Sequence, residues 1–144
     1  LHKYFSGVLA DSLDDEPLFD RFVQEREAIM QAYEDKSFAK VVRLVTQLAD
    51  LANQYVDKHK PWVLVKDPDN MDKVHAVVTT TMHLFRLLVL YLEPIIPDTA
   101  QKVAGIFHQE AMIWDSIDSK LYHQKVTTFP RLLERITHAD CPVV

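Results

Sequence analysis

The stretch SFAKVVRLVTQLADLANQYVDKHKPW, residues 37–62, carries the clearest structural signal in the chain. Its apolar residues recur with the 3.6-residue period of an amphipathic helix, which we expect to run from about Ser37 to Lys58. The predicted apolar face consists of Phe38, Val41, Val42, Val45, Leu48, Ala49, Ala52, Tyr55 and Val56. The opposite, polar stripe consists of Arg43, Gln47, Asp50, Gln54 and Asp57, whose spacing places them above one another on the exposed side.

Pro61 ends this helix directly before a large aromatic residue, Trp62. Proline lacks the amide that continues a helix, and it biases the residue before it towards extended backbone. Trp62 is therefore expected at a corner. Two interpretations of its ring follow from the residues alone: a core residue that staples the loop, or a platform beside Lys58 and Lys60 on which a nucleotide base stacks.

An acidic cluster, DDEP at 14–17, marks the start of an earlier helix. Asp14 or Asp15 suits its N-cap, Pro17 suits its first turn, and the helix should reach about Tyr33. One face of it would hold Leu18, Phe22, Ile29 and Tyr33. We interpret the acidic run at 11–20 as a solvated helix start, and the first dozen residues as a connector.

Two further helices follow the corner. Asn70 suits the cap of a helix from about Met71 to Leu92, whose second half is apolar on nearly every side and should be the buried centre. Pro97 suits the first position of a helix that reaches about Phe107. We expect 109–128 to be irregular, with Trp114 and Tyr122 as packing anchors, and a short helix at about 129–136. The prediction is an all-α bundle of four or five helices.

Composition agrees with one such domain over residues 1–144. The chain has 144 residues and only two glycines, which disfavours glycine-rich phosphate loops and turn-rich β folds. Net charge is −5, but residues 36–73, which hold Trp62, carry seven basic and five acidic side chains. If the chain binds a nucleic acid, we therefore expect recognition through local contacts in this segment rather than through a large basic surface.

No motif for catalysis or metal binding is present. The seven histidines lack an HExxH pattern or a pair four residues apart, and the single Cys141 excludes an internal disulfide. We expect no metal site and no catalytic residue. Because the apolar run at 84–97 is interrupted by charges and prolines, and residues 1–13 do not resemble a signal peptide, we expect no membrane partner and a cytoplasmic location. The first residue is not Met, so a longer parent is expected.

At four segments the chain resembles the anticodon-binding domain of methionyl-tRNA synthetase, of the longer bacterial type. The segments are LADLANQYVDKHKPW (48–62), LFRLLVLYLEPIIP (84–97), WDSI (114–117) and HQKVTTFPRLLERI (123–136), in the order and spacing of the family. The resemblance covers essentially the whole chain. It implies a helical bundle, like those of class Ia synthetases, that recognises the CAU anticodon of methionine tRNAs.

The resemblance also implies roles for individual residues. Trp62 matches the tryptophan that stacks mainly on the first anticodon base, and Pro61 sets its angle. Asp50 and Asp57 match acidic positions that disfavour non-cognate anticodons, a device that agrees with their shared helix face. Arg135 matches a basic residue of the segment that folds back towards the catalytic domain. Asn53, between the two aspartates in the sequence, and Lys60, next to Pro61, complete the candidate anticodon-binding set.

Some family features are absent from the chain. The family's other anticodon readers, an asparagine and an arginine four apart, lie just upstream of residue 1, and the nucleotide-binding motifs belong to the preceding catalytic domain. We therefore expect no cofactor here; the parent would use ATP and Mg²⁺, with zinc possible in an insertion of its catalytic domain. Expected partners are the anticodon loop of methionine tRNA and the catalytic domain of the same chain, and some parents dimerise through a further C-terminal domain.

Two alternatives stay open at this point. One is the homologous domain of an isoleucyl, valyl, leucyl or cysteinyl synthetase. The other, from a different class, is a helical protein–protein interaction module with Trp62 in its core.

Overall fold

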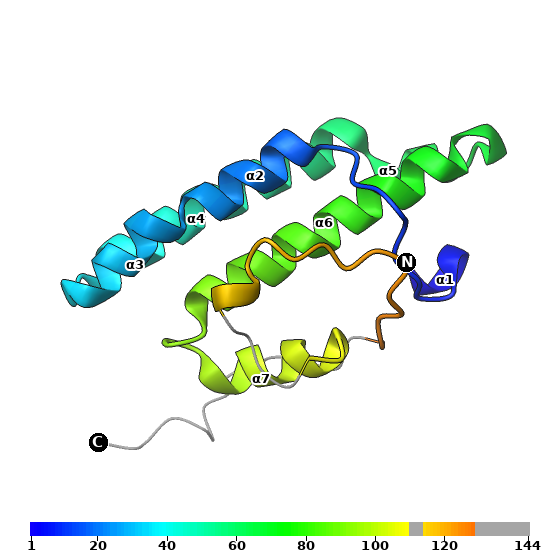
Figure 1. The fold of residues 1–144 in the computed structure, drawn as a ribbon. Coiled ribbons are helices and arrows are strands. Elements are labelled where there is room, and N and C mark those ends of the chain that lie inside the picture. The colour runs from blue at the N-terminus through cyan, green and yellow to red at the C-terminus, as the bar shows by residue number, and fades with distance from the viewer. Residues whose placement is uncertain (110–113, 129–144) are drawn as a thin grey trace, which may run out of the picture.

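The computed structural model describes residues 1–109 and 114–128, and within them the fold is helical (Figure 1). The helices are α1 (His2–Phe5), α2 (Glu16–Gln24), α3 (Arg26–Glu34), α4 (Phe38–His59), α5 (Pro61–Leu64), α6 (Met71–Leu92) and α7 (Pro97–Ile106), with 3₁₀ turns η1 (Pro68–Asn70) and η2 (Trp114–Ser116). The predicted all-α bundle is confirmed. The helix predicted at 129–136, and Arg135 with it, lies outside the described residues.

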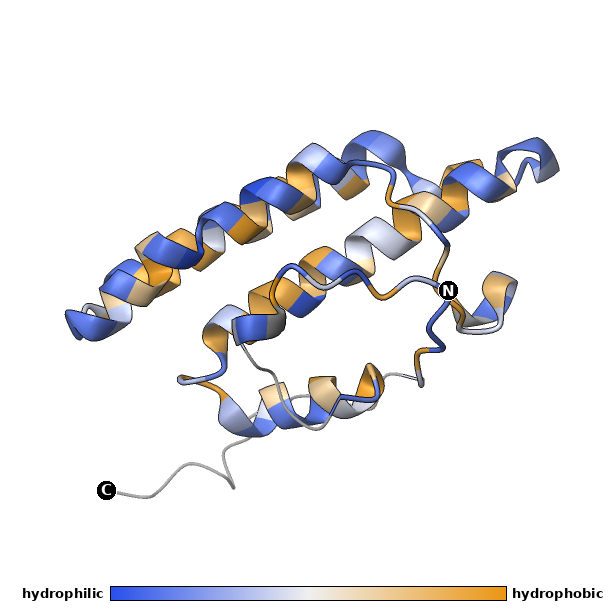
Figure 2. Cartoon of the chain, in the orientation of Figure 1, coloured by the Kyte–Doolittle hydropathy of each residue, from blue (hydrophilic) through white to orange (hydrophobic). Residues whose placement is uncertain are grey.

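Helix α6 is the centre of the bundle. It contacts α2, α4, α5 and α7, so that Figure 1 shows it between the layer of α2, α3 and α4 on one side and α7 on the other. Leu84, Leu87 and Leu90 have no exposed surface. Figure 2 shows hydrophilic residues on the outer side of α2 and hydrophobic residues on its side towards α6. The predicted bounds and the central position of α6 are both confirmed.

One helix in the described part of the chain, Pro68–Leu92, is long and apolar enough to cross a membrane by length and composition. Most of its apolar window, 61%, is buried among the other helices of the bundle. The same composition is therefore accounted for by its place as the core helix.

The predicted helix from residue 15 to Tyr33 is instead two helices, α2 and α3, that meet at Glu25. Asp15 is the N-cap, as predicted, and its carboxylate accepts a hydrogen bond from the Leu18 amide at 3.0 Å. The break has a tertiary cause: the Tyr91 hydroxyl of α6 donates to the carbonyls of Phe22 and Val23, which interrupts the helical ladder. The buried positions become Phe19, Phe22, Ile29 and Ala32, while Leu18 and Tyr33 are half-buried.

The first dozen residues are not a mere connector. Leu9 and Leu13 belong to the core, and the Ala10 amide donates to the Thr79 hydroxyl of α6 at 2.9 Å. The Leu9 amide also donates to the carbonyl of Gln124 at 2.9 Å, so this segment lies between α6 and residues 122–126. The segment is short and has no apolar periodicity of its own, so the sequence pattern does not predict that it is buried.

Helix α4 ends one residue later than predicted, and its polar stripe is exposed as expected. Its buried line is narrower than the predicted apolar face and consists of Val41, Val45, Leu48 and Tyr55. Phe38 and Val42 are exposed, contrary to the prediction. Phe38 lies in the first turn, where its ring meets the edge of Tyr33, and Val42 lies to one side of the buried line.

The irregular character predicted for 109–128 holds for its described part, apart from η2 and an isolated bridge between Val8 and Lys125. Trp114 is a packing anchor as predicted, with its ring edge-on to Tyr33 at 5.9 Å and to Tyr91 at 5.3 Å between centroids. Tyr122 is half-buried and its ring lies 6.3 Å from that of His83.

Candidate nucleic-acid interface

The junction of α4 and α5 forms the corner that the sequence predicts. Helix α4 stops at His59, and Pro61 is the first residue of the one-turn helix α5. Lys60, between them, has left-handed backbone (φ 45°, ψ 62°), not the extended backbone expected before proline. The left-handed residue ends the helix by donating its amide to the Val56 carbonyl at 2.8 Å, which satisfies one of the terminal carbonyls.

Trp62 follows on this corner with 54% of its surface exposed. The interpretation of Trp62 as a core residue is therefore wrong for this structure. The exposed ring is held by a short helix whose backbone bonds run from Val63 and Leu64 to the Lys60 carbonyl at 2.8 and 3.1 Å. An exposed indole on a fixed turn offers a flat face to a ligand.

The Trp62 ring borders an apolar pocket of about 220 Å³. Its walls come from α1, from the turn of α5 and from the first half of α6: Leu1, Tyr4, Phe5, Pro61, Trp62, Val65, Val74 and Val78. Tyr4 is 48% exposed, and the Lys3 ammonium lies 5.1 Å from the centre of its ring. Two accessible aromatic rings from distant parts of the chain thus share one pocket.

The sequence interpretation did not include Tyr4. The available signal was the adjacent basic and aromatic residues of HKYF at 2–5, a pattern compatible with nucleic-acid contact. What it could not show is that α1 and α5 border the same pocket.

Asp50, Asn53, Asp57 and Lys60 are all exposed. Asp57 is in the last turn of α4 and Asp50 lies two turns back on the same side, about 10 Å along the axis. Within the described residues neither carboxylate takes part in an ion pair or side-chain hydrogen bond. Their charges are therefore not neutralised by a neighbour. Asn53 also borders a second, smaller pocket of about 180 Å³ between α4 and α6.

Asp14, which the sequence interpretation placed in a solvated acidic run, is instead largely buried beneath the end of α4. Its carboxylate accepts a hydrogen bond from the Tyr55 hydroxyl at 2.8 Å and pairs with the ammonium of Lys73 and with His59 Nε2, the latter at 3.3 Å. Burial alone would raise the Asp14 pKa, but the bonds from Lys73 and Tyr55, with the charges of Lys73 and His59, lower it below its ordinary value.

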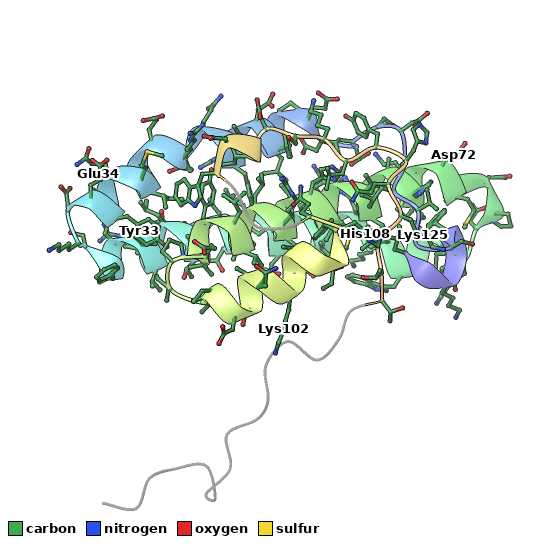
Figure 3. All side chains as sticks on the ribbon, turned by 60° about the horizontal axis from the view of Figure 1, so that its bottom comes forward. Tyr33, Glu34, Asp72, Lys102, His108 and Lys125 are labelled. Atoms are coloured by element: carbon green, nitrogen blue, oxygen red, sulfur yellow. The ribbon has the colours of Figure 1, made fainter. Side chains whose placement is uncertain are left out.

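A pocket larger than the one beside Trp62 lies away from the corner. It measures about 300 Å³ and lies at the other end of α4, lined by Met30, Tyr33, Glu34, Pro94 and Trp114. Figure 3 shows Tyr33 and Glu34 at the end of the bundle opposite Asp72, which belongs to the first turn of α6. None of the candidate residues borders it. Size alone therefore does not mark the functional site.

In the described part of the chain no three residues of the types His, Cys, Asp and Glu come together as metal ligands. The two histidines of α6 have structural partners: His75 stacks on Phe5 with centroids 4.1 Å apart, and His83 lies in the core.

Comparison with known proteins decides between the remaining assignments of the chain to a protein family. The family model described as "Anticodon binding domain of methionyl tRNA ligase" matches residues 10–133. The chain belongs to this family. The alternatives of an isoleucyl, valyl, leucyl or cysteinyl synthetase domain and of a protein-interaction module are thereby set aside.

One curated relative agrees with this assignment, and one solved structure is similar to the chain in fold. Methionine–tRNA ligase of Buchnera aphidicola subsp. Schizaphis graminum (strain Sg) is 41% identical over 138 residues, which are 96% of this chain and 25% of the relative. The crystal structure of the apo form of Mycobacterium tuberculosis methionyl-tRNA synthetase aligns with a TM-score of 0.69 at 16% identity, over 90% of this chain and 28% of that one. It shows the same fold. The chain thus spans about a quarter of the length of these proteins.

Proposed function

We propose that the corner of this anticodon-binding domain recognises the CAU anticodon of methionine tRNA, with the Trp62 ring stacked on an anticodon base, mainly the first. The observation that carries the proposal is the 54% exposure of a tryptophan on a fixed turn of a domain from an anticodon-binding family. Stacking on one aromatic ring contributes about 1–3 kcal/mol per base. Pro61 and Lys60 fix the angle of the ring.

In this proposal the residues next to Trp62 discriminate between cognate and non-cognate anticodon loops. Asp50 and Asp57 hold unneutralised charges on the helix face that leads to the corner, and so repel phosphates of RNA loops that approach in a non-cognate geometry. Asn53 provides a hydrogen-bonding amide on the same helix, and Lys60 a cation for the backbone. The pocket between Trp62 and Tyr4 gives the stacked base an apolar wall.

The parent of this domain is proposed to be a cytoplasmic methionine–tRNA ligase that attaches methionine to its tRNA with ATP. Its chemistry, with Mg²⁺ and possible zinc, would belong to the catalytic domain, onto which Arg135 and its segment would fold, and dimerisation to a separate domain. No residue of this chain is assigned to those steps. This domain would contribute tRNA identity through binding.

The test is the binding of an RNA hairpin with a CAU loop to the chain and to its Trp62→Ala variant. We expect Trp62→Ala to raise the Kd about tenfold or more, in line with the loss of one stacked base, while helical circular dichroism stays unchanged. Val63→Ala is the matched control because Val63 is an equally exposed apolar residue of the same short helix. Equal losses from both variants, or an unchanged Kd for Trp62→Ala, would contradict the proposal.

A further inference from the structure

A single carboxylate joins three parts of the molecule beneath the Trp62 corner. The Asp14 side chain is only 8% exposed. It contacts Tyr55 and His59, which lie one turn apart at the end of α4, and Lys73 in the first turn of α6. The rings of Tyr55 and His59 lie 4.4 Å apart between centroids, so the carboxylate and the two rings form one packed unit.

The backbone that carries Asp14 is itself attached to α6. The Asp14 amide donates to the Thr80 hydroxyl at 2.8 Å, and four residues earlier the Ala10 amide donates to Thr79 at 2.9 Å. Both threonines are fully buried. The carboxylate is therefore a fixed point, and the end of α4 is tied to it.

Trp62 lies three residues beyond His59, with only Lys60 and the rigid Pro61 between them. A rotation of the last turn of α4 would therefore be passed on to the indole ring. The backbone bonds of Val63 and Leu64 to the Lys60 carbonyl make α5 follow α4 as a unit.

We infer that Asp14 is a positioning residue for anticodon binding: by tying Tyr55 and His59 to α6 through Lys73, it holds the end of α4 at the angle that presents Trp62 to RNA. The inference rests on the proposed function of Trp62. Asp14 is acidic, and nothing in the sequence of its own segment suggests contact with RNA.

The sign of the effect separates positioning from simple electrostatics. Removal of a negative charge near an RNA site strengthens binding when only the field changes. Loss of a positioning contact weakens it. Asp14→Asn keeps the shape of the side chain and removes its charge, and Asp11→Asn is the matched control because Asp11 is exposed in the same segment.

We expect Asp14→Asn to raise the Kd for the CAU hairpin about fivefold, which corresponds to about 1 kcal/mol, and Asp11→Asn to leave it unchanged or lower it slightly. Both are measured at a temperature where circular dichroism shows each variant fully folded. The decisive comparison is a double-mutant cycle with Trp62→Ala. If Asp14 acts through the ring, Asp14→Asn has no further effect once the ring is gone.

Additive effects in the cycle, or an unchanged or stronger affinity of Asp14→Asn, would overturn the inference. An unchanged Kd for Trp62→Ala alone would instead overturn the proposed function, and the inference with it. Should Asp14→Asn fail to fold, Tyr55→Phe removes only one hydrogen bond to the carboxylate and is expected to weaken binding in the same direction, by less. An affinity of folded Tyr55→Phe equal to that of the unaltered chain would count against the inference.

Discussion

At the scale of single residues, His83 shows how a polar side chain is accommodated in the core of α6. It has no exposed surface. Its Nδ1–H donates to the Thr79 carbonyl at 2.8 Å, and its Nε2 accepts from the Leu121 amide at 2.8 Å. The second bond requires a lone pair on Nε2, so the arrangement selects the neutral ring. Burial, opposed by the bond to Thr79 and assisted by the charges of Arg86 and Lys120, lowers the His83 pKa to about 4.

The pH dependence of stability follows from this shift. In the unfolded chain His83 titrates near 6.5, so between about pH 6.5 and 4 the unfolded state binds the proton that the folded state excludes. The free energy of unfolding should therefore fall as pH falls through this window, by on the order of 3 kcal/mol. Urea unfolding at several pH values measures it.

His83→Gln should flatten this slope, although it lowers stability at neutral pH because the core contacts change. His108→Gln is the control, since His108 is exposed. An equally steep slope in His83→Gln would refute the assignment to His83. Asp14 affects stability in a different pH window. Its pKa is lowered in the folded chain, so the stabilisation that its carboxylate provides is lost only as pH falls below the ordinary pKa of an aspartate.

At the scale of elements, the junction of α4 and α5 depends on the left-handed backbone of Lys60. Residues with a Cβ are disfavoured there by about 1–2 kcal/mol, whereas glycine adopts this conformation readily. We expect Lys60→Gly to raise the free energy of unfolding by up to about 1 kcal/mol, because part of the relieved strain is offset by the greater entropy of the unfolded chain. The same change should weaken hairpin binding, since it removes a cation beside Trp62.

The control for Lys60→Gly is Lys58→Gly, which alters an exposed lysine two residues earlier, inside α4. There glycine should lower stability by about 1 kcal/mol. Thermal or urea unfolding of both variants gives the comparison, and a loss of stability in both would show that the backbone of Lys60 is not strained.

The helices that the sequence predicts best are those whose ends are set by local chemistry. Pro61 follows the end of α4, and Pro97 is the first residue of α7. The period of the apolar residues predicts the length of α4 and α6. The break at Glu25 and the buried segment around Leu9 depend on Tyr91 and Thr79 of α6, far away in the sequence. No local pattern encodes a partner 69 residues distant.

The candidate site divides in the same way. The exposed positions of Asp50 and Asp57 follow from helical spacing, but the exposure of Trp62 did not, because its surroundings depend on how α1 and α6 flank the corner. Tyr4 and Asp14 were missed for the same reason. Both become recognisable as neighbours of the corner only when the segments that carry them are packed against α6.

At the scale of the whole molecule, net charge and the proposed partner are opposed: the chain carries −5 and the partner is an anion. The corner offers few exposed cations: Lys58, Lys60 and Lys66 at the end of α4 and on the turn after it, and Lys3 beside Tyr4. Binding must therefore rest on stacking at Trp62 more than on phosphate contacts, and the repulsion from Asp50 and Asp57 extends over the nearby surface.

This balance predicts a weak dependence of hairpin affinity on salt. With at most about four phosphates neutralised, the slope of log K against log salt concentration should be no steeper than about −3. Titrations of the CAU hairpin at several salt concentrations measure the slope.

The double variant Asp50→Asn/Asp57→Asn should bind cognate and non-cognate hairpins more tightly, and this gain in affinity should shrink as salt screens the charges. The variant should also discriminate less between the two kinds of hairpin. Glu27→Gln/Glu34→Gln is the matched control, because these exposed carboxylates have the same seven-residue spacing on α3, at the far end of the bundle (Figures 1 and 3). A slope much steeper than about −3, or an equal gain from both double variants, would mean that general electrostatic attraction, and not the corner, determines affinity.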